Sequence, residues 1–328
     1  MRRLCFGLVA ALLLFPMTIM SVLAAQDASP AAADSAFADL GLPTLDVTVT
    51  PDGFEGVPEE LEAGRYLVTV TVAEDVEFGS GIGFVQPPEG MTPDEFLAAG
   101  EAPGPAEVEG EAPGGTPVLT DEASPAAMQG GPPAEIFQAT YAGGIFALAG
   151  QSAQVVLDLP SGEWIAWADD PEATQEPVIL NVTGEMPADL PAPEAGATVV
   201  MGEYLIEVSE GELVSGQQVI ELQNIGAQPH FIFLGEIPDT VTEADIAAVL
   251  EIEMQAEMTG TPPVYEDFNP EEDFRPVFGT GTQSGGTTIW IPVTLEAGTY
   301  GAVCFFPDVS DGLPHAYHGM YTVLEVGE

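Results

Sequence analysis

The chain has 328 residues, of which 53 are acidic and four are basic, and its formal net charge is −49 at pH 7. This balance excludes nucleic acid as a partner, because phosphate binding needs a basic surface, and an anionic membrane surface would repel the chain. Acidity of this size indicates a soluble protein, a salty or acidic environment, or a basic partner.

The first 25 residues are predicted to be a secretory signal peptide. Arg2 and Arg3 precede an apolar run that ends at the small residues Ala24 and Ala25, an order typical of such leaders. An uncleaved membrane anchor is the alternative, but the small residues favour cleavage. We therefore expect a secreted or periplasmic protein without stable membrane insertion, in which residues 26–44 form a disordered N-terminal segment.

The two halves of the sequence repeat one pattern of predicted elements. The segments that begin at Gly64 and Gly216 each show the alternation of a β-strand after a turn. A helix start follows in each half, at Thr92 and at Thr242, where a threonine with an acidic residue three positions later is a capping signature. The second helix is expected to end before Gly260.

The closing strands repeat as well. Residues 153–168 match residues 288–304, and residues 177–185 match residues 320–328, each run being short and bounded by glycine or proline. Short strands with one short helix insertion per repeat predict an all-β protein made of two β-sandwich domains. We interpret the repeat as an internal duplication.

The repeat divides the chain into two predicted domains. They are expected at residues 45–185 and 198–328, and a linker rich in alanine and proline connects them at residues 186–197. Residues 101–135 consist mainly of Gly, Pro, Ala and Glu, which indicates a low-complexity insertion without fixed structure. The first domain contains no histidine, so we expect no imidazole-containing metal site there.

Residues that bind soft metals are concentrated in the second domain. His230, His315 and His318 are all the histidines of the chain, and Cys304 is the one cysteine that follows the leader. A lone exported cysteine is either a buried apolar residue or a metal thiolate. Together with Met320 these residues suit copper, whereas zinc would bind the thiolate and the imidazoles but not the thioether.

The second domain resembles the cupredoxins, the blue copper protein family. The resemblance rests on Asn224-Ile-Gly-Ala-Gln-Pro-His230, on Ala297-Gly298-Thr-Tyr300 leading to Cys304, and on Pro314-His315 and Gly319-Met320. It implies a Greek-key β-sandwich in both domains, the first being a degenerate copy without metal ligands. It also implies one type 1 copper ion with the ligands His230, Cys304, His315 and Met320.

The resemblance has further implications for single residues. His315 would be the ligand nearest the solvent and the point where electrons leave. His318 is expected to be a surface residue, with a role as an alternative ligand left open. Phe231 follows the first histidine at a position where many family members have asparagine.

The function expected from these residues is electron transfer by a single copper ion, with a redox protein that has a basic docking face as the partner. A copper-binding or copper-delivering protein and a metal-free structural module are the alternatives. We expect the protein not to be an enzyme, because multicopper oxidases and copper nitrite reductases need more histidines. Glu210, Asp308 and Asp311 are expected to be solvated carboxylates, although the two aspartates would lower the copper potential.

Overall fold

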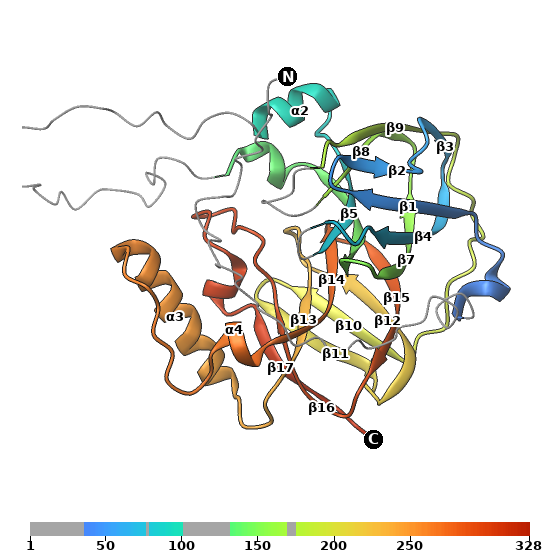
Figure 1. The fold of residues 1–328 in the computed structure, drawn as a ribbon. Coiled ribbons are helices and arrows are strands. Elements are labelled where there is room, and N and C mark those ends of the chain that lie inside the picture. The colour runs from blue at the N-terminus through green and yellow to red at the C-terminus, as the bar shows by residue number, and fades with distance from the viewer. Residues whose placement is uncertain (1–35, 77–78, 101–131, 169–174) are drawn as a thin grey trace, which may run out of the picture.

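The computed structural model describes residues 36–76, 79–100, 132–168 and 175–328 (Figure 1). The predicted signal peptide, most of the predicted segment 26–44 and most of the predicted insertion 101–135 lie outside the described residues. Within the described ranges, no helix is long and apolar enough to cross a membrane.

Nearly all regular structure in the described residues is β, as the sequence predicts. The strands of the N-terminal half are β1 (Thr44–Thr50), β2 (Gly53–Glu55), β3 (Glu60–Glu62), β4 (Gly64–Val72), β5 (Gly79–Gln86), β6 (Thr140–Leu148), β7 (Ser152–Leu159), β8 (Gly162–Trp167) and β9 (Val178–Thr183). Those of the C-terminal half are β10 (Ala197–Gly202), β11 (Leu205–Gly211), β12 (Gly216–Asn224), β13 (Phe233–Ile237), β14 (Arg275–Gln283), β15 (Thr288–Leu295), β16 (Gly298–Val303) and β17 (Tyr321–Val326). The helices are α2 (Pro93–Gly100), α3 (Glu243–Thr259) and α4 (Pro270–Asp273), with the 3-10 turns η1 (Ala38–Leu40), η3 (Ala134–Phe137) and η4 (His315–His318).

The described strands form two sheets that both run through the two halves of the chain. Their orders are β11-β10-β12-β15-β7-β4-β1-β2 and β17-β16-β13-β14-β6-β5-β8-β9-β3. The halves repeat the same pairing: β1 is parallel to β4 and β10 is parallel to β12, while β8–β9 and β16–β17 are antiparallel. The repeat in the sequence is therefore a repeat of strand pairing, and the predicted all-β fold class is confirmed.

The two halves meet along equivalent strands. Val156 of β7 pairs with Trp290 of β15, and Ile145 of β6 pairs with Thr280 of β14. In Figure 1 this seam lies between the N-terminal strands above and the C-terminal strands below. Each half thus covers a sheet edge that the other would leave exposed, which is one way in which proteins avoid unwanted strand pairing.

Strand β4 shows why these segments form strands. Val68 and Val70 have no exposed surface and Val72 is 1% exposed, whereas Thr71 between them faces the solvent. Side chains that alternate between faces place every second residue in the core, and β-branched residues pack well on a pleated surface. The same alternation places apolar side chains in the core between the two sheets in both halves.

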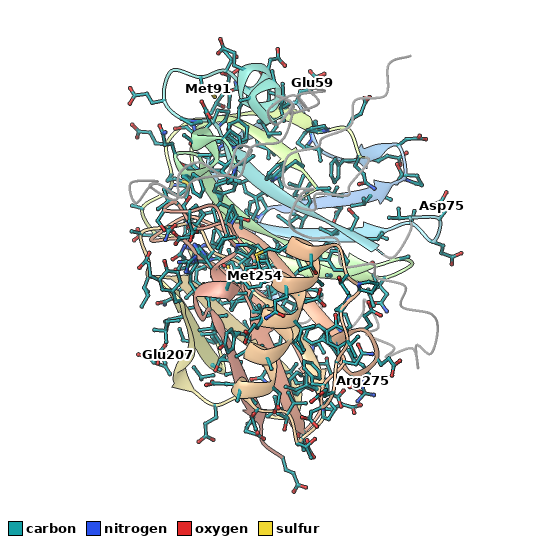
Figure 2. All side chains as sticks on the ribbon, turned by 90° about the vertical axis from the view of Figure 1, so that its left-hand side faces the viewer. Glu59, Asp75, Met91, Glu207, Met254 and Arg275 are labelled. Atoms are coloured by element: carbon teal, nitrogen blue, oxygen red, sulfur yellow. The ribbon has the colours of Figure 1, made fainter. Side chains whose placement is uncertain are left out.

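Many acidic side chains lie outside this core. Glu59 and Asp75 in the N-terminal half and Glu207 in the C-terminal half are exposed and point outward (Figure 2). The large negative charge is thus spread over the surface of both halves, where it favours solubility.

Both predicted helices form where the capping signatures indicate. The backbone N–H of Thr242 donates to Asp245 over 2.8 Å before α3, and that of Thr92 donates to Glu95 over 2.9 Å before α2. Helix α3 ends before Gly260, whose φ of 64° is left-handed. Glycine adopts this conformation without strain, so the predicted end of the helix is confirmed.

Two predicted boundaries are wrong within the described residues. The N-terminal segment is not disordered up to residue 44, because Phe37 is 2% exposed and packs in a cluster with Leu67 and Trp290. The low-complexity insertion does not extend to residue 135, because η3 begins at Ala134 and buries Ile136. In both places a single large apolar side chain fixes a segment whose composition is otherwise that of a loop.

Candidate metal centre

His230 lies in a loop that the end of β12 holds in place. The side-chain amide of Asn224 donates to the backbone oxygens of Gln228 and Gln283 over 2.8 and 2.7 Å, and its oxygen accepts from the N–H of Gly226. The backbone of His230 exchanges two hydrogen bonds with Gln283, of 3.0 and 2.8 Å. The loop is therefore tied to strand β14, and His230 has a fixed place in the core.

Cys304 follows β16 directly, and the loop after it returns through His315 and Met320. The N–H of Cys304 donates to Met320 O over 3.1 Å, and the N–H of His315 donates to Phe306 O over 2.8 Å. The N–H of Met320 in turn donates to His315 O over 3.0 Å. These backbone bonds close the loop and bring the cysteine, the second histidine and the methionine next to one another.

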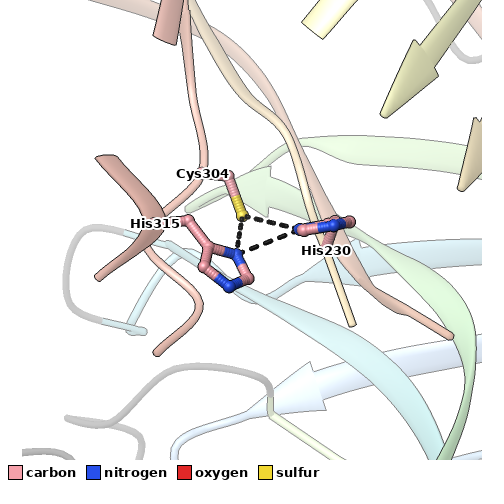
Figure 3. Close-up of side chains that lie close together, drawn as sticks. All are labelled: His230, Cys304 and His315. Atoms are coloured by element: carbon pink, nitrogen blue, oxygen red, sulfur yellow. Dashed lines mark hydrogen bonds between the residues drawn. The ribbon is translucent and has the colours of Figure 1, made fainter. Parts of the chain in front are cut away.

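The two imidazoles and the thiol form a buried triangle (Figure 3). The Nδ1 atoms of His230 and His315 are 3.0 Å apart, and Cys304 Sγ lies 4.0 and 3.7 Å from them. These separations define a point about 2.1 Å from all three atoms, close to the roughly 2.0–2.3 Å at which imidazole and thiolate bind a metal such as zinc. The three side chains have no exposed surface, so the donor set fits a metal ion in a dry site.

Met320 completes this group of residues. It has no exposed surface, and its backbone is bonded to both Cys304 and His315. Two imidazoles, one thiolate and a thioether are the donors of a type 1 copper site. The group has the composition typical of such a site, and copper is the metal that it fits.

Burial also prepares the two imidazoles for a metal. It lowers the pKa of His230 to about 4, helped by the neighbouring His315, and it lowers the pKa of His315 to about 4. Both rings are therefore neutral at pH 7. The Nε2 atom of each ring has no hydrogen-bond partner, although metal-bound histidines usually place a hydrogen-bonding group at their second nitrogen.

A buried carboxylate lies near the outer nitrogen of His315. Asp308 is 1% exposed, and its Oδ2 is 3.7 Å from His315 Nε2. Burial alone would raise the pKa of Asp308, but hydrogen bonds from Ser310, Tyr204 and Gln228 outweigh it and hold the pKa well below its usual range. The expectation that Asp308 is a solvated surface carboxylate is therefore wrong, because the loop wraps donors around it.

A second carboxylate lies near the outer nitrogen of His230. Glu203 Oε1 is 4.0 Å from His230 Nε2, and it accepts hydrogen bonds from the backbone N–H groups of Ala227 and Gln228. Burial would raise the pKa of Glu203, and these hydrogen bonds, with a smaller contribution from His230, lower it instead. Each imidazole of the triangle thus has a negative charge on its outer side.

Gln228 ties the two ligand loops together. Its side-chain amide donates to Asp308 Oδ2 over 2.9 Å, and its oxygen accepts from the N–H of Val309 over 2.8 Å. Phe231, the residue after the first histidine, packs against the core. Gln228 lies within the segment from Asn224 to His230 on which the family resemblance partly rests. The sequence alone gave it no role, because its partners are some 80 positions away.

Tyr204 covers the triangle on the solvent side. Its ring lies edge-on to His315 at 5.9 Å between centroids and 5.2 Å from the ring of His318, and its hydroxyl donates to Asp308 over 2.6 Å. Its φ of 60° is left-handed, which is uncommon for a residue other than glycine. Tyr204 leaves His315 with no exposed surface, and His230 and Cys304 have none either, so the expectation that His315 is the ligand nearest the solvent stays a prediction.

His318 does not join the triangle. It is half-buried, and its Nε2 lies 3.2 Å from Asp311 Oδ1, in a second group with Asp308. The carboxylate of Asp308 already accepts hydrogen bonds from Ser310, Tyr204 and Gln228. These fill the roughly four acceptor positions of a carboxylate, so this second group lacks a free third ligand.

The N-terminal half forms part of the wall of the site. Phe137 and Tyr141 meet Phe306 edge-on, at 6.1 and 5.9 Å between ring centroids, and Phe306 lies 6.0 Å from His315. Tyr141 also receives a hydrogen bond from Ser284 across the seam. The half without metal donors thus helps to exclude water from the half that has them.

No family model and no curated protein matches the sequence. Solved structures do: a reduced auracyanin from Roseiflexus castenholzii is 21% identical, covers 40% of this chain and 95% of its own, and has a TM-score of 0.25. Auracyanin A, a "blue" copper protein from Chloroflexus aurantiacus, is 20% identical, with coverages of 40% and 98% and a TM-score of 0.25. A copper nitrite reductase from Nitrosomonas europaea is 10% identical, with coverages of 87% and 94% and a TM-score of 0.22.

These matches are similarities of fold, and they bear on one prediction. Structures that match over most of the chain include the nitrite reductase and a multi-copper oxidase from Pediococcus acidilactici, which are enzymes. The prediction that this protein is not an enzyme is therefore withdrawn. The strands themselves show the predicted fold class: the described residues form an all-β protein.

Proposed function

We propose that this protein is an exported electron-transfer protein with one type 1 copper ion. His230, Cys304, His315 and Met320 would hold the metal. The observation that carries the proposal is the buried triangle of two Nδ1 atoms and one Sγ atom, with separations of 3.0, 3.7 and 4.0 Å. A thioether beside this triangle favours copper over zinc.

The protein's own residues would keep the site nearly unchanged during electron transfer. A bound copper ion would supply one-electron chemistry between its singly and doubly charged states. Because both imidazoles are already neutral, neither has to lose a proton when the metal binds. The backbone bonds of His230 to Gln283 and of Cys304 to Met320 fix the donors, so little has to move when an electron passes.

The surface charge supports a basic partner. The two arginines in the described residues are both paired with acids, Arg65 with Asp158 and Arg275 with Glu236. A redox protein with a basic face would be drawn to such a surface, and its association would slow as salt is added. Export would follow from the predicted signal peptide and would place this encounter outside the cytoplasm.

Copper binding without an electron-transfer role is a second candidate, and the burial of the triangle favours it. A site in which His230, Cys304 and His315 have no exposed surface would release its metal slowly. Rapid electron exchange with a small redox mediator would support electron transfer. Slow exchange combined with tight retention of Cu(I) would support copper binding.

The test is the visible absorption and electron paramagnetic resonance of the mature protein after addition of Cu(II). We expect an intense band at roughly 600 nm, as for a copper–thiolate site of this geometry. Cys304→Ser should abolish the band, while His318→Ala should leave it in place as the matched control. A colourless wild-type protein that binds no copper stoichiometrically would overturn the proposal and favour a metal-free module.

A further inference from the structure

Asp308 is the charged group of the Cys304–His315 loop that lies deepest in the protein. It is 1% exposed, and its Oδ2 atom is 3.7 Å from the outer nitrogen of His315. A buried charge is unfavourable unless hydrogen bonds replace the water that it has lost. A carboxylate kept in such a place therefore calls for a physical explanation.

The structure provides these hydrogen bonds from three directions. Oδ1 accepts from the backbone and the hydroxyl of Ser310, and Oδ2 accepts from Tyr204 over 2.6 Å and from Gln228 over 2.9 Å. Gln228 comes from the loop of His230, and Tyr204 comes from the turn between β10 and β11 in an uncommon backbone conformation. Such outliers persist where the surrounding structure fixes them, and they are frequent at functional sites.

We propose that Asp308 acts as the fixed negative charge of the metal site and favours the oxidised over the reduced metal ion. This inference rests on the proposed function. Reduction adds one electron from the partner and lowers the metal charge from two to one, so an anion beside a ligand stabilises the reactant more than the product. Because Asp308 is enclosed by protein, solvent and salt weaken this interaction little.

Two other carboxylates near the site, which are more exposed, can be compared with Asp308. Glu203 lies 4.0 Å from the outer nitrogen of His230, but its side chain is 42% exposed. The side chain of Asp311 is 24% exposed and pairs with His318, which lies outside the triangle. Water and salt reach both of these charges, so their effect on the metal should be smaller than that of Asp308 and should fade as salt is added.

The experiment compares the copper-loaded wild-type protein with Asp308→Asn and with Asp311→Asn as the matched control. We expect Asp308→Asn to shift the ratio of Cu(I) to Cu(II) affinity at least tenfold toward Cu(I), which raises the reduction potential by about 59 mV. This shift should persist from low to high salt. Asp311→Asn should change the ratio less than threefold, and its change should disappear at high salt.

A further variant separates charge from position. Tyr204→Phe keeps the ring and the charge of Asp308 but removes one donor, so its potential should stay close to that of the wild type. Equal shifts in Tyr204→Phe and Asp308→Asn would overturn the inference, because they would assign the effect to loop geometry. Asp308→Ser takes the place of Asp308→Asn if the latter does not fold, as judged by near-ultraviolet circular dichroism of the metal-free protein.

The outcomes also separate this inference from the proposed function. A blue wild-type protein with an unchanged potential in the Asp308 variants would overturn the role of Asp308 alone. A wild-type protein that binds no copper would overturn both.

Discussion

The two halves of the chain share their strand pairing but differ at the strand ends. Strand β8 ends before Ala168 and β16 ends before Cys304, and both residues are buried at equivalent places. In the C-terminal half the neighbouring loops add His230, His315 and Met320, whereas the N-terminal half has no histidine. The comparison shows that the two halves have equivalent strand ends. Among the described residues, only the C-terminal strand end is surrounded by four metal-binding side chains, which come from two loops.

The strongest test of this difference between the halves is to substitute the residues at the equivalent strand ends. Cys304→Ser should remove the copper–thiolate absorption entirely, because a hydroxyl is a poor ligand for this metal. Ala168→Cys should not create a second absorbing site, because no imidazole is available in that half. Absorption spectra after copper titration check both variants, and a second band in Ala168→Cys would contradict our account.

The shared sheets predict that the halves unfold together. Trp164 has no exposed surface and donates to Pro160 O over 2.8 Å in the N-terminal half. Trp164→Ala should lower the free energy of unfolding by about 3–5 kcal/mol. Because β7 and β15 pair across the seam, denaturation followed by tryptophan fluorescence and by copper absorption should give coincident transitions. Separate transitions would show that the seam is weak.

The histidines predict a pH dependence that only the C-terminal half can produce. The pKa values of His230 and His315 fall from the ordinary value of 6.5 to about 4 on folding. Between these pH values the unfolded chain binds more protons, so the free energy of unfolding of the metal-free protein falls as the pH is lowered from 6.5 to 4. Each imidazole contributes up to roughly 3 kcal/mol.

A double variant, His230→Gln with His315→Gln, provides the control for this pH dependence. Urea denaturation at several pH values should show that the variant lacks the loss of stability between pH 6.5 and 4. The carboxylate of Asp308, whose pKa is depressed, contributes a separate loss at lower pH. An identical pH profile in the wild type and the double variant would contradict the assignment to the two imidazoles.

The two described arginines, one in each half, give the smallest expected effect. Arg65 pairs with Asp158, lies 4.4 Å from the ring centre of Trp290 across the seam, and is only 11% exposed. Arg275 pairs with Glu236 but is 71% exposed. Arg65→Ala should lower the free energy of unfolding by about 2 kcal/mol, and Arg275→Ala by about 0–1 kcal/mol. Equal losses in thermal denaturation would mean that the seam contact contributes little.

Local patterns in the sequence determined the strands, the helix caps and the donor residues. The alternation around Val68 and the threonine caps at Thr92 and Thr242 depend on neighbours within four positions, so they can be predicted without tertiary contacts. The grouping of His230, Cys304 and His315 followed from the small number of donor residues and from the family resemblance. Side-chain chemistry and short spacing were sufficient for this part.

Only the tertiary structure decided the surroundings of the site. Tyr204 and Gln228 reach Asp308 across 104 and 80 positions of sequence, so no local pattern indicates that the carboxylate is buried or that His315 is covered. The seam likewise depends on the pairing of β6 with β14 and of β7 with β15, which composition does not specify. Burial, the pKa values and the wall formed by the N-terminal half all arise from these long-range contacts, because each depends on which surfaces exclude water together.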